Sequence, residues 1–311
     1  MGEKQAWQVG AILNETPEVT LKFAAWYLEQ GAQRVTLLCD NPEDPVLSLL
    51  ADHPQVACIP CTEDFWRGLG MENETRFPKR QNAAMTWLYQ QQSRGWFLNV
   101  DADEFLYCSQ GQIEALLAHQ PTDTTSVRVA TAEALAGEGG DSRQAFRLPM
   151  GRDTSRDVYQ EDAFLFPPRR MGLVGHPQGK SFTRCGDATL RLRQHWPERR
   201  RVGRLPEVFL GAESGCYLLH AIGADYDIWR AKLLWRIGSS GFRPGLAQHI
   251  EQILAGEDPE PALRDLHQKL HYASAELAQR MRAAGVLLEL ALGLDALVVK
   301  HFGDDGAVNN R

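Results

Sequence analysis

The stretch Trp96-Phe97-Leu98-Asn99-Val100-Asp101-Ala102-Asp103-Glu104-Phe105-Leu106-Tyr107 decides the fold of this chain. It begins as a short apolar run, changes abruptly to the carboxylates Asp101, Asp103 and Glu104, and then returns to apolar residues. An apolar run of this length predicts a buried central strand. Ligands of open α/β sheets bind beyond the carboxyl ends of the strands, so these acids are candidates for a binding site.

The spacing of the acids points to a metal ion. If the chain stays extended after Val100, Asp101 and Asp103 point the same way, because side chains repeat every second residue along a strand. Two carboxylates on one side suit Mg²⁺ or Mn²⁺, with a phosphate completing the shell. Three acids near a core would repel one another, which makes a cation a sensible partner. The alternative is that the acids only form a turn or cap a helix.

The composition indicates an ordinary globular protein. A chain of 311 residues, 43% hydrophobic and 23% charged, is long enough for one large α/β domain with a helical extension, or for two modest domains. A net charge of −7 argues against general nucleic-acid binding. The local exception is the group Arg199, Arg200, Arg201 and Arg204. It reads as a solvated loop, with an acidic partner or a lipid headgroup as the alternative.

The cellular compartment is predicted from transmembrane and signal segments and from the use of cysteine. No run approaches the length of a transmembrane helix, and the first residues lead directly into a strand without a signal peptide. Six cysteines are scattered along the chain, and Cys58 and Cys61 have no second pair at zinc spacing. We therefore predict six free thiols in a cytoplasmic protein, with a peripheral position at the inner face of the membrane as a further option.

The first hundred residues alternate between strands and helices. We predict strands over Trp7–Leu13, Arg34–Cys39 and Val56–Ile59, a helix from Pro17 with Thr16 as its N-cap, and a helix over Gln81–Gln92. With the central strand after them, these elements predict an α/β fold with a mostly parallel, Rossmann-like mixed sheet flanked by helices.

The rest of the chain is less periodic. Residues 137–168 are rich in Gly and charge, which predicts long functional loops. Cys216–Leu219 reads as a strand ending at His220, and the chain after Gly241 reads as wholly helical. We expect a catalytic domain over 1–240 and a helical C-terminal extension over 241–311, whose apolar helix faces pack back on the domain or form a homodimer.

Four blocks in this order resemble the GT-A-fold, family 2-like bacterial glycosyltransferases, of the subgroup with an Asp-x-Asp-Glu-Phe core. The blocks are Asn14-Glu15, then Asp40-Asn41, then Gln81 with the Trp96–Phe105 run, and last Lys180 with His195, His220, Lys232 and Arg236. The similarity covers about residues 7–240. It implies a GT-A-like fold and a hexosyltransferase that uses a nucleoside-diphosphate-sugar donor, with a UDP-sugar favoured.

The resemblance also implies roles for these residues. Asp103 would ligate Mn²⁺ or Mg²⁺, which bridges the two donor phosphates, and Asp101 would contact the metal or the ribose. His220 would be a third ligand, with His195 as its competitor, although a structural histidine is the alternative. The implied donor-binding residues are Asn14, Glu15, Asp40, Asn41, Gln81, Asp101, Lys180 and Lys232. For Asn14, Glu15 and Asp40, capping or turn formation is the alternative.

The implied reaction is inverting transfer to a hydroxyl of a glycan or lipid-linked glycan, as in polysaccharide biosynthesis. Such transfer needs a general base, and the candidates in the predicted acceptor loop are Asp153, Asp157, Glu161 and Asp162. Two rival functions are a sugar-1-phosphate nucleotidyltransferase and a non-catalytic nucleotide- or glycan-binding protein of the same fold. The first would need a Gly-rich basic loop after strand one, where this chain has Asn14-Glu15-Thr16-Pro17. The missing Gly-x-Gly-x-x-Gly also argues against a dinucleotide oxidoreductase.

Overall fold

The computed structural model describes residues 6–72, 74–109, 113–137, 143–238 and 242–303. Its contacts divide the chain into two compact units. Unit 1 comprises residues 1–130, 178–218 and 293–311, and unit 2 comprises residues 131–177 and 219–292. The predicted boundary at residue 240 falls in the segment 239–241, outside the described residues, and stays a prediction.

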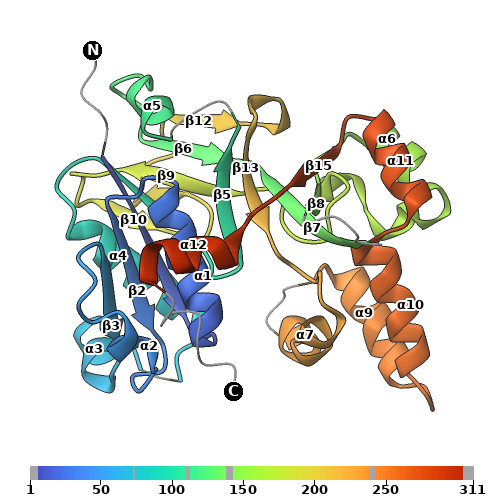
Figure 1. Cartoon of the computed structure of the whole chain (residues 1–311), viewed down its shortest axis with the longest axis horizontal. Helices are drawn as coiled ribbons and strands as arrows, with labels where there is room; N and C mark the ends of the chain where they lie inside the picture. Colours follow the sequence, from blue (N-terminus) through green and yellow to red (C-terminus); the bar gives the residue numbers. More distant parts are fainter. Residues whose placement is uncertain (1–5, 73, 110–112, 138–142, 239–241, 304–311) are drawn as a thin grey trace. The chain divides into compact units, whose positions relative to one another are not determined.

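Unit 1 contains a mixed sheet of seven strands in the order β12-β6-β9-β4-β1-β2-β3 (Figure 1). The strands are β1 (Trp7–Leu13), β2 (Arg34–Cys39), β3 (Val56–Pro60), β4 (Trp96–Asn99), β6 (Ser126–Val129), β9 (Lys180–Arg184) and β12 (Glu207–Leu210). β9 runs antiparallel to both of its neighbours, and every other neighbouring pair is parallel. The predicted fold class, a mostly parallel α/β sheet flanked by helices, is confirmed.

The predicted helix start is confirmed in α1 (Pro17–Glu29). The Thr16 side chain accepts a hydrogen bond from the Val19 backbone N–H at 3.5 Å, and Pro17 occupies the first turn. The face of α1 that carries Phe23 and Tyr27 is buried. β1 and β2 consist of near-continuous buried residues, as expected for strands of a parallel sheet that is covered on both faces.

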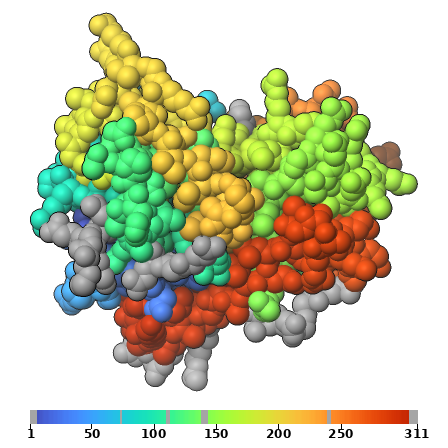
Figure 2. Space-filling view, turned by 90° about the horizontal axis from the view of Figure 1, so that it is seen from above, coloured from blue at the N-terminus to red at the C-terminus, as the bar shows by residue number. Residues whose placement is uncertain are grey.

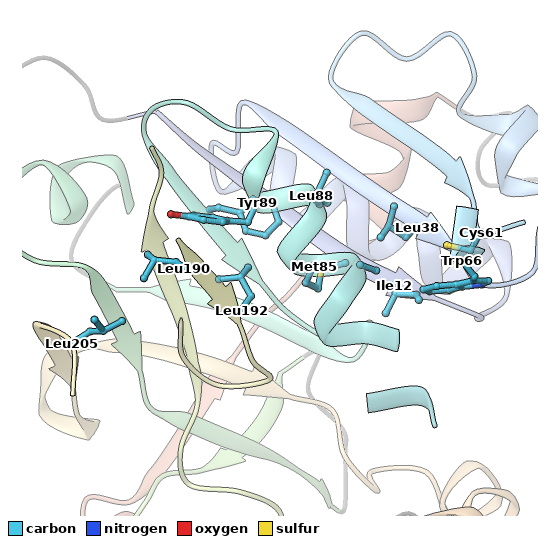
Figure 3. Packing of buried hydrophobic residues seen from close by; sticks show 12 residues of the cluster. Ile12, Leu38, Cys61, Trp66, Met85, Leu88, Tyr89, Leu190, Leu192 and Leu205 are labelled. Atoms are coloured by element: carbon cyan, nitrogen blue, oxygen red, sulfur yellow. The ribbon is translucent and has the colours of Figure 1, made fainter. Parts of the chain in front are cut away.

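A second apolar layer forms around α4 (Phe77–Gln90). Figure 3 shows the α4 side chains Met85, Leu88 and Tyr89 beside Leu190 and Leu192 of β10. β10 (Leu190–Leu192) forms an antiparallel hairpin with β11 (Pro197–Arg199). The chain reverses after Leu192. The buried leucines of β10 hold this hairpin against α4.

The last helix returns to unit 1. α12 (Leu294–Phe302) packs beside α1, as Figure 1 shows. Lys300 Nζ and His301 Nε2 lie 2.6 and 2.9 Å from the Glu29 carboxylate. The remaining elements of unit 1 are α2 (Val46–Leu49), α3 (Glu63–Gly68), β5 (Glu104–Cys108), α5 (Ile113–Ala118) and η3 (Ala212–Ser214). β13 (Cys216–His220) begins in unit 1 and ends in unit 2.

Unit 2 is built on a small sheet. β8 (Gln144–Arg147) pairs antiparallel with β7 (Thr131–Gly137) and with β15 (Leu287–Leu290), and β14 (Tyr272–Ala273) pairs parallel with β7. Its helices are α6 (Arg152–Tyr159), η1 (Gln160–Leu165), η2 (Pro168–Arg170), α7 (Tyr226–Ala231), α8 (Leu233–Gly238), α9 (Pro244–Leu254), α10 (Glu260–His271) and α11 (Ala275–Ala283).

Two sequence predictions are wrong in this unit. The described part of residues 137–168 contains β8, α6 and η1 rather than long loops alone. The chain after Gly241 is not wholly helical, because β14 and β15 lie between its helices. The Leu-rich run of β15 fits a helix or a strand equally well by its pattern, and pairing with β8 decides for the strand.

An ion pair between Glu133 and Arg147 lies inside unit 2, with both side chains at most 1% exposed. Arg147 Nε donates to Glu133 Oε2 at 2.9 Å. The same carboxylate accepts from the backbone N–H groups of Val174 at 2.8 Å and Gly175 at 2.5 Å. Every partner of this carboxylate that the structure describes is a donor, so the buried charge is compensated on several sides.

The prediction of six free thiols is wrong. Cys108, at the end of β5, forms a disulfide with Cys216, at the start of β13, and the other four cysteines are free. The two partners are 108 residues apart in sequence, a distance at which spacing gives no signal. Disulfides are rare in reducing compartments, so cysteine usage does not support the cytoplasmic prediction. Among the described helices, none has the length and apolar content needed to cross a membrane.

Candidate functional site at the carboxyl edge of the unit 1 sheet

The acidic run follows β4 as a tight turn. The backbone N–H of Glu104 donates to the carbonyl oxygen of Asp101 at 3.1 Å, and β5 begins at Glu104. The chain is therefore not extended here, and alternation along a strand does not set the directions of Asp101 and Asp103. The expectation of an extended path is wrong because Glu104 reverses the chain at once.

Asp101 is held by two side chains from distant elements. Gln81 Nε2, on α4, donates to Asp101 Oδ1 at 2.5 Å, and Lys180 Nζ, at the start of β9, donates to Oδ2 at 2.8 Å. The Lys180 side chain is 2% exposed, whereas that of Asp101 is 42% exposed. The predicted residues Gln81, Asp101 and Lys180 thus come together, with only the carboxylate open to solvent.

The third acid of the run belongs to the scaffold. Glu104 Oε2 accepts from the Asp101 backbone N–H at 2.8 Å and lies 3.3 Å from Lys180 Nζ. Burial acts to lower the pKa of Lys180, but the charges of Asp101 and Glu104 outweigh it and raise that pKa above its usual value. The repulsion that predicted a cation is therefore already offset by the ammonium group of Lys180.

Asp40 is engaged by a residue that the sequence analysis missed. Arg80 Nη1 and Nη2 lie 2.6 and 3.3 Å from the two Asp40 oxygens, and its guanidinium lies over the Trp66 ring at 4.8 Å. The signal was available, because Arg80 directly precedes Gln81 on α4. Arg80 therefore fixes the orientation of the Asp40 carboxylate at the end of β2.

The other predicted donor contacts lie at the same edge. Asn14 follows β1, Asp40 follows β2 and Asp101 follows β4, and these three strands are parallel neighbours. Asn14 is exposed and Glu15 is half-buried. Asn41 Oδ1 accepts from the backbone N–H of Glu43 at 3.0 Å, which gives Asn41 a turn-forming role.

A segment from the β10–β11 hairpin crosses the end of β4. Asn99 Nδ2 donates to the Arg193 carbonyl at 3.1 Å, and Gln194 Nε2 donates to Gln81 Oε1 at 3.3 Å. His195 Nδ1 donates to the Gly179 carbonyl at 2.8 Å, which fixes its proton on that nitrogen. Gln194 was not predicted, because its contact with Gln81 joins residues 113 apart in sequence and depends on the β10–β11 hairpin.

The residues at this edge fit a divalent cation only together with a ligand. Asp101 and Asp103 are half-buried and offer the carboxylate oxygens that Mg²⁺ and Mn²⁺ prefer. Within the described ranges, no group of three His, Cys, Asp or Glu residues gathers as a metal cage. Magnesium sites often consist of one or two carboxylates plus substrate phosphates, and the two aspartates match this class.

The remaining predicted residues belong to unit 2. His220 ends β13 beside Gly175, and a Cβ atom at Gly175 would lie 3.8 Å from its ring. Lys232 follows α7 as its C-cap residue and is half-buried. Arg236, the third basic residue of the resemblance, is buried in α8.

The four candidate bases also lie in unit 2. Asp153 and Asp157 are exposed on α6, Glu161 is exposed on η1, and Asp162 beside it is half-buried. Exposed acids on a helix are most often only solvated, so their arrangement does not single out one base. Their assignment stays a prediction.

A scan of protein-family profiles finds no matching family, and a search of curated proteins finds no relative. Among solved structures, the chain is similar to a mannosyltransferase from Pyrobaculum calidifontis in complex with GDP-Man and Mn²⁺, with 13% identity, a TM-score of 0.37, and 91% of this chain and 75% of that chain covered. It is also similar to HddC from Yersinia pseudotuberculosis, with 12% identity, a TM-score of 0.28, and 45% and 67% covered. A third is UDP-glucose pyrophosphorylase from Acinetobacter baumanii, with 11% identity, a TM-score of 0.27, and 96% and 92% covered. Scores this low carry no argument about function.

Proposed function

We propose that this protein is a divalent-metal-dependent glycosyltransferase that moves a sugar from a nucleoside-diphosphate-sugar to an acceptor hydroxyl, with inversion. The observation that carries the proposal is the half-open Asp101 carboxylate at the carboxyl end of β4, held in place by Gln81 and buried Lys180. This position, at the edge where parallel strands end, is where open α/β sheets bind nucleotides. The fold class and the resemblance of the acidic run support the same function.

Each residue has a physical role in the proposal. Asp101 and Asp103 would hold the cation together with the donor diphosphate, and the cation would neutralise charge on the departing nucleoside diphosphate. Lys180 holds the Asp101 carboxylate in place, because its buried ammonium group donates a hydrogen bond to Asp101 Oδ2. Asn14 and Glu15, beyond β1, would hydrogen-bond the base or ribose of the donor.

The acceptor side is proposed to lie in unit 2. Asp153, Asp157, Glu161 and Asp162 remain the candidates for the base that removes the acceptor proton. Alanine at each of them should leave nucleotide affinity, measured by calorimetry, nearly unchanged. At least one should reduce transfer by a factor of about a hundred or more. Wild-type transfer by all four variants would place the base elsewhere.

Asp103→Asn tests the donor site. We expect it to abolish Mn²⁺-dependent binding of nucleoside diphosphates with little loss of stability, because asparagine keeps the shape of the side chain and removes a charge from a run of acids. The readout is thermal stabilisation by each diphosphate with and without Mn²⁺, since a ligand of the native state raises the melting temperature. Asp52→Asn, the same change at an exposed position of unit 1, is the matched control.

The outcomes separate the proposal from its rivals. If Asp103→Asn binds a diphosphate in Mn²⁺ as tightly as the wild type, the metal role is wrong. Release of pyrophosphate from a nucleoside triphosphate and a sugar-1-phosphate would identify a nucleotidyltransferase instead. Binding of a nucleotide-sugar without transfer to glycan acceptors or to water would favour the non-catalytic alternative.

A further inference from the structure

A second polar hollow lies in unit 1, and Arg193 and Trp196, from the segment that crosses the end of β4, are among the residues that line it. It is a hollow of about 740 Å³ between β6, the start of β12 and the residues from Arg191 to Leu205. Figure 2 shows the chain around residue 200, coloured yellow, standing out from the surface. We call this hollow the arginine pocket, because Arg128 and six arginines between residues 191 and 204 line it.

The charge of the arginine pocket is far from balanced. Its lining holds seven arginines and two glutamates, which leaves an excess of five positive charges. Asp187, just outside the lining, pairs with Arg199 and offsets one of them. The whole chain has a net charge of −7, so this excess is local and opposite in sign to the protein. Like charges gathered in one hollow repel each other, and an anionic ligand would relieve that repulsion.

Some of the arginines are fixed and others are available. Arg128 is held by Glu207, with Nε–Oε2 and Nη2–Oε1 distances of 3.1 and 2.9 Å, and by the Gln178 carbonyl at 2.8 Å. Arg193 pairs with Glu198 at 2.7 Å. Among described residues, no hydrogen bond or ion pair is formed by the exposed side chains of Arg191, Arg200 or Arg201.

The pocket also has apolar groups at its rim. Trp196 and Val202 line it with 37% and 49% of their surface exposed, and Phe209, 47% exposed, lies beneath the Arg128 guanidinium at 4.5 Å. Leu205, which lines the pocket, belongs to the buried core cluster shown in Figure 3. Arginine forks beside exposed aromatic rings suit an anionic headgroup at a wet apolar boundary.

We propose that the arginine pocket binds the phosphate or diphosphate group of a multiply charged ligand. Guanidinium groups match phosphate oxygens with paired hydrogen bonds, and an excess of several charges suits a multiply charged group better than a single carboxylate. The phosphate can belong to a lipid headgroup or to a soluble compound. The proposal does not depend on the proposed function, because its residues do not include the carboxylates around Asp101.

The test uses the full chain and two kinds of probe. Vesicles of phosphatidylcholine with about one third phosphatidylglycerol report on a lipid headgroup, and neutral phosphatidylcholine vesicles are their control. Calorimetry with inorganic pyrophosphate and with inorganic phosphate reports on soluble ligands. The variant R200Q/R201Q removes two free charges, and R34Q/R94Q is its matched control, because Arg34 and Arg94 are exposed residues of unit 1 outside the pocket.

We expect binding of anionic vesicles, of pyrophosphate, or of both, and a loss of about thirtyfold in R200Q/R201Q, the value for two basic residues at an anionic surface. The control variant should stay within about twofold of the wild type. Vesicle binding in which pyrophosphate competes assigns the phosphate to a lipid, and pyrophosphate binding without vesicle binding assigns it to a soluble compound.

Three results would overturn the proposal. The first is no binding of either probe, and the second is equal loss in both variants, which would indicate only a general charge effect. The third is tighter binding of a single-stranded RNA oligonucleotide than of the phosphate probes, which would make the pocket a nucleic-acid site. Melting curves of both variants confirm that each is folded when it is compared.

Discussion

Two ion pairs of this protein bury a basic side chain equally well but differ in their acid. In unit 2, Arg147 pairs with Glu133, and neither side chain is more than 1% exposed. In unit 1, Lys180 is 2% exposed, but its partner Asp101 is 42% exposed. A pair closed on both sides can only support the fold, whereas a pair with an open carboxylate can still accept a ligand. The difference separates a structural ion pair from a candidate site.

The largest expected effect comes from breaking the closed pair. Arg147→Met should reduce the free energy of unfolding by about 3–5 kcal/mol, because it leaves the Glu133 charge buried with only backbone donors. Denaturant unfolding measures this loss. Glu133→Gln, which keeps the shape and removes the charge, should also destabilise. A loss below about 1 kcal/mol for both variants would mean that the pair is no more structural than a surface ion pair.

Removing Lys180, the buried partner of the ion pair with Asp101, should reduce the free energy of unfolding by a smaller amount. Lys180→Met should reduce the free energy of unfolding by about 1–3 kcal/mol, because Glu104 loses its charged partner while water can still reach Asp101. From the open side, Asp101→Asn should cost under about 1 kcal/mol, since the carboxylate is partly solvated. If Lys180→Met and Asp101→Asn reduce the free energy of unfolding equally, the exposure of the Asp101 carboxylate does not lower its contribution to stability, and the comparison between the two ion pairs fails.

A further effect is expected from pH, through a histidine facing Arg147. Burial first, and then the charges of Arg147, His267, Arg236 and His220, hold the pKa of His271 well below its usual value. Below about pH 6.5 the unfolded chain therefore binds a proton that the folded chain does not, so stability falls by up to about 1.4 kcal/mol per pH unit.

Unfolding free energies between pH 7 and pH 5 measure this effect. His271→Gln should flatten the slope, although His267, whose pKa burial also lowers, keeps part of it. His119→Gln, the same change at an exposed position of unit 1, is the matched control. If the slope of His271→Gln matches that of the wild type, His271 takes up its proton as easily in the folded chain as in the unfolded one.

The sequence predicted what is local in unit 1. β1 and β2 have the predicted bounds, Thr16 caps α1 as expected, and the acidic run follows the central strand. These features depend on periodicity and on capping chemistry, which neighbouring residues determine. The resemblance also selected Gln81, Asp101 and Lys180, which the structure brings together across 99 residues of sequence.

The missed features depend on contacts between distant parts of the chain. Glu104 was expected beside a cation, but it turns inward to Lys180, a partner that no local pattern reveals. The disulfide of Cys108 with Cys216 and the pairing of β15 with β8 have the same origin. Arg80 directly precedes Gln81 in the sequence, but its ion pair with Asp40 and its contact with the Trp66 ring are visible only in the structure.

The packing of α12 on α1 has a consequence for the order in which the protein can fold during synthesis. Unit 1 needs residues 293 onward, whereas every residue of unit 2 lies between 131 and 292. Translation proceeds at about 5–20 residues per second, and domains tend to fold as they emerge. Unit 2 therefore has all its residues before unit 1 does. Until α12 emerges, the nascent chain exposes the α1 surface around Glu29 that Lys300 and His301 later cover.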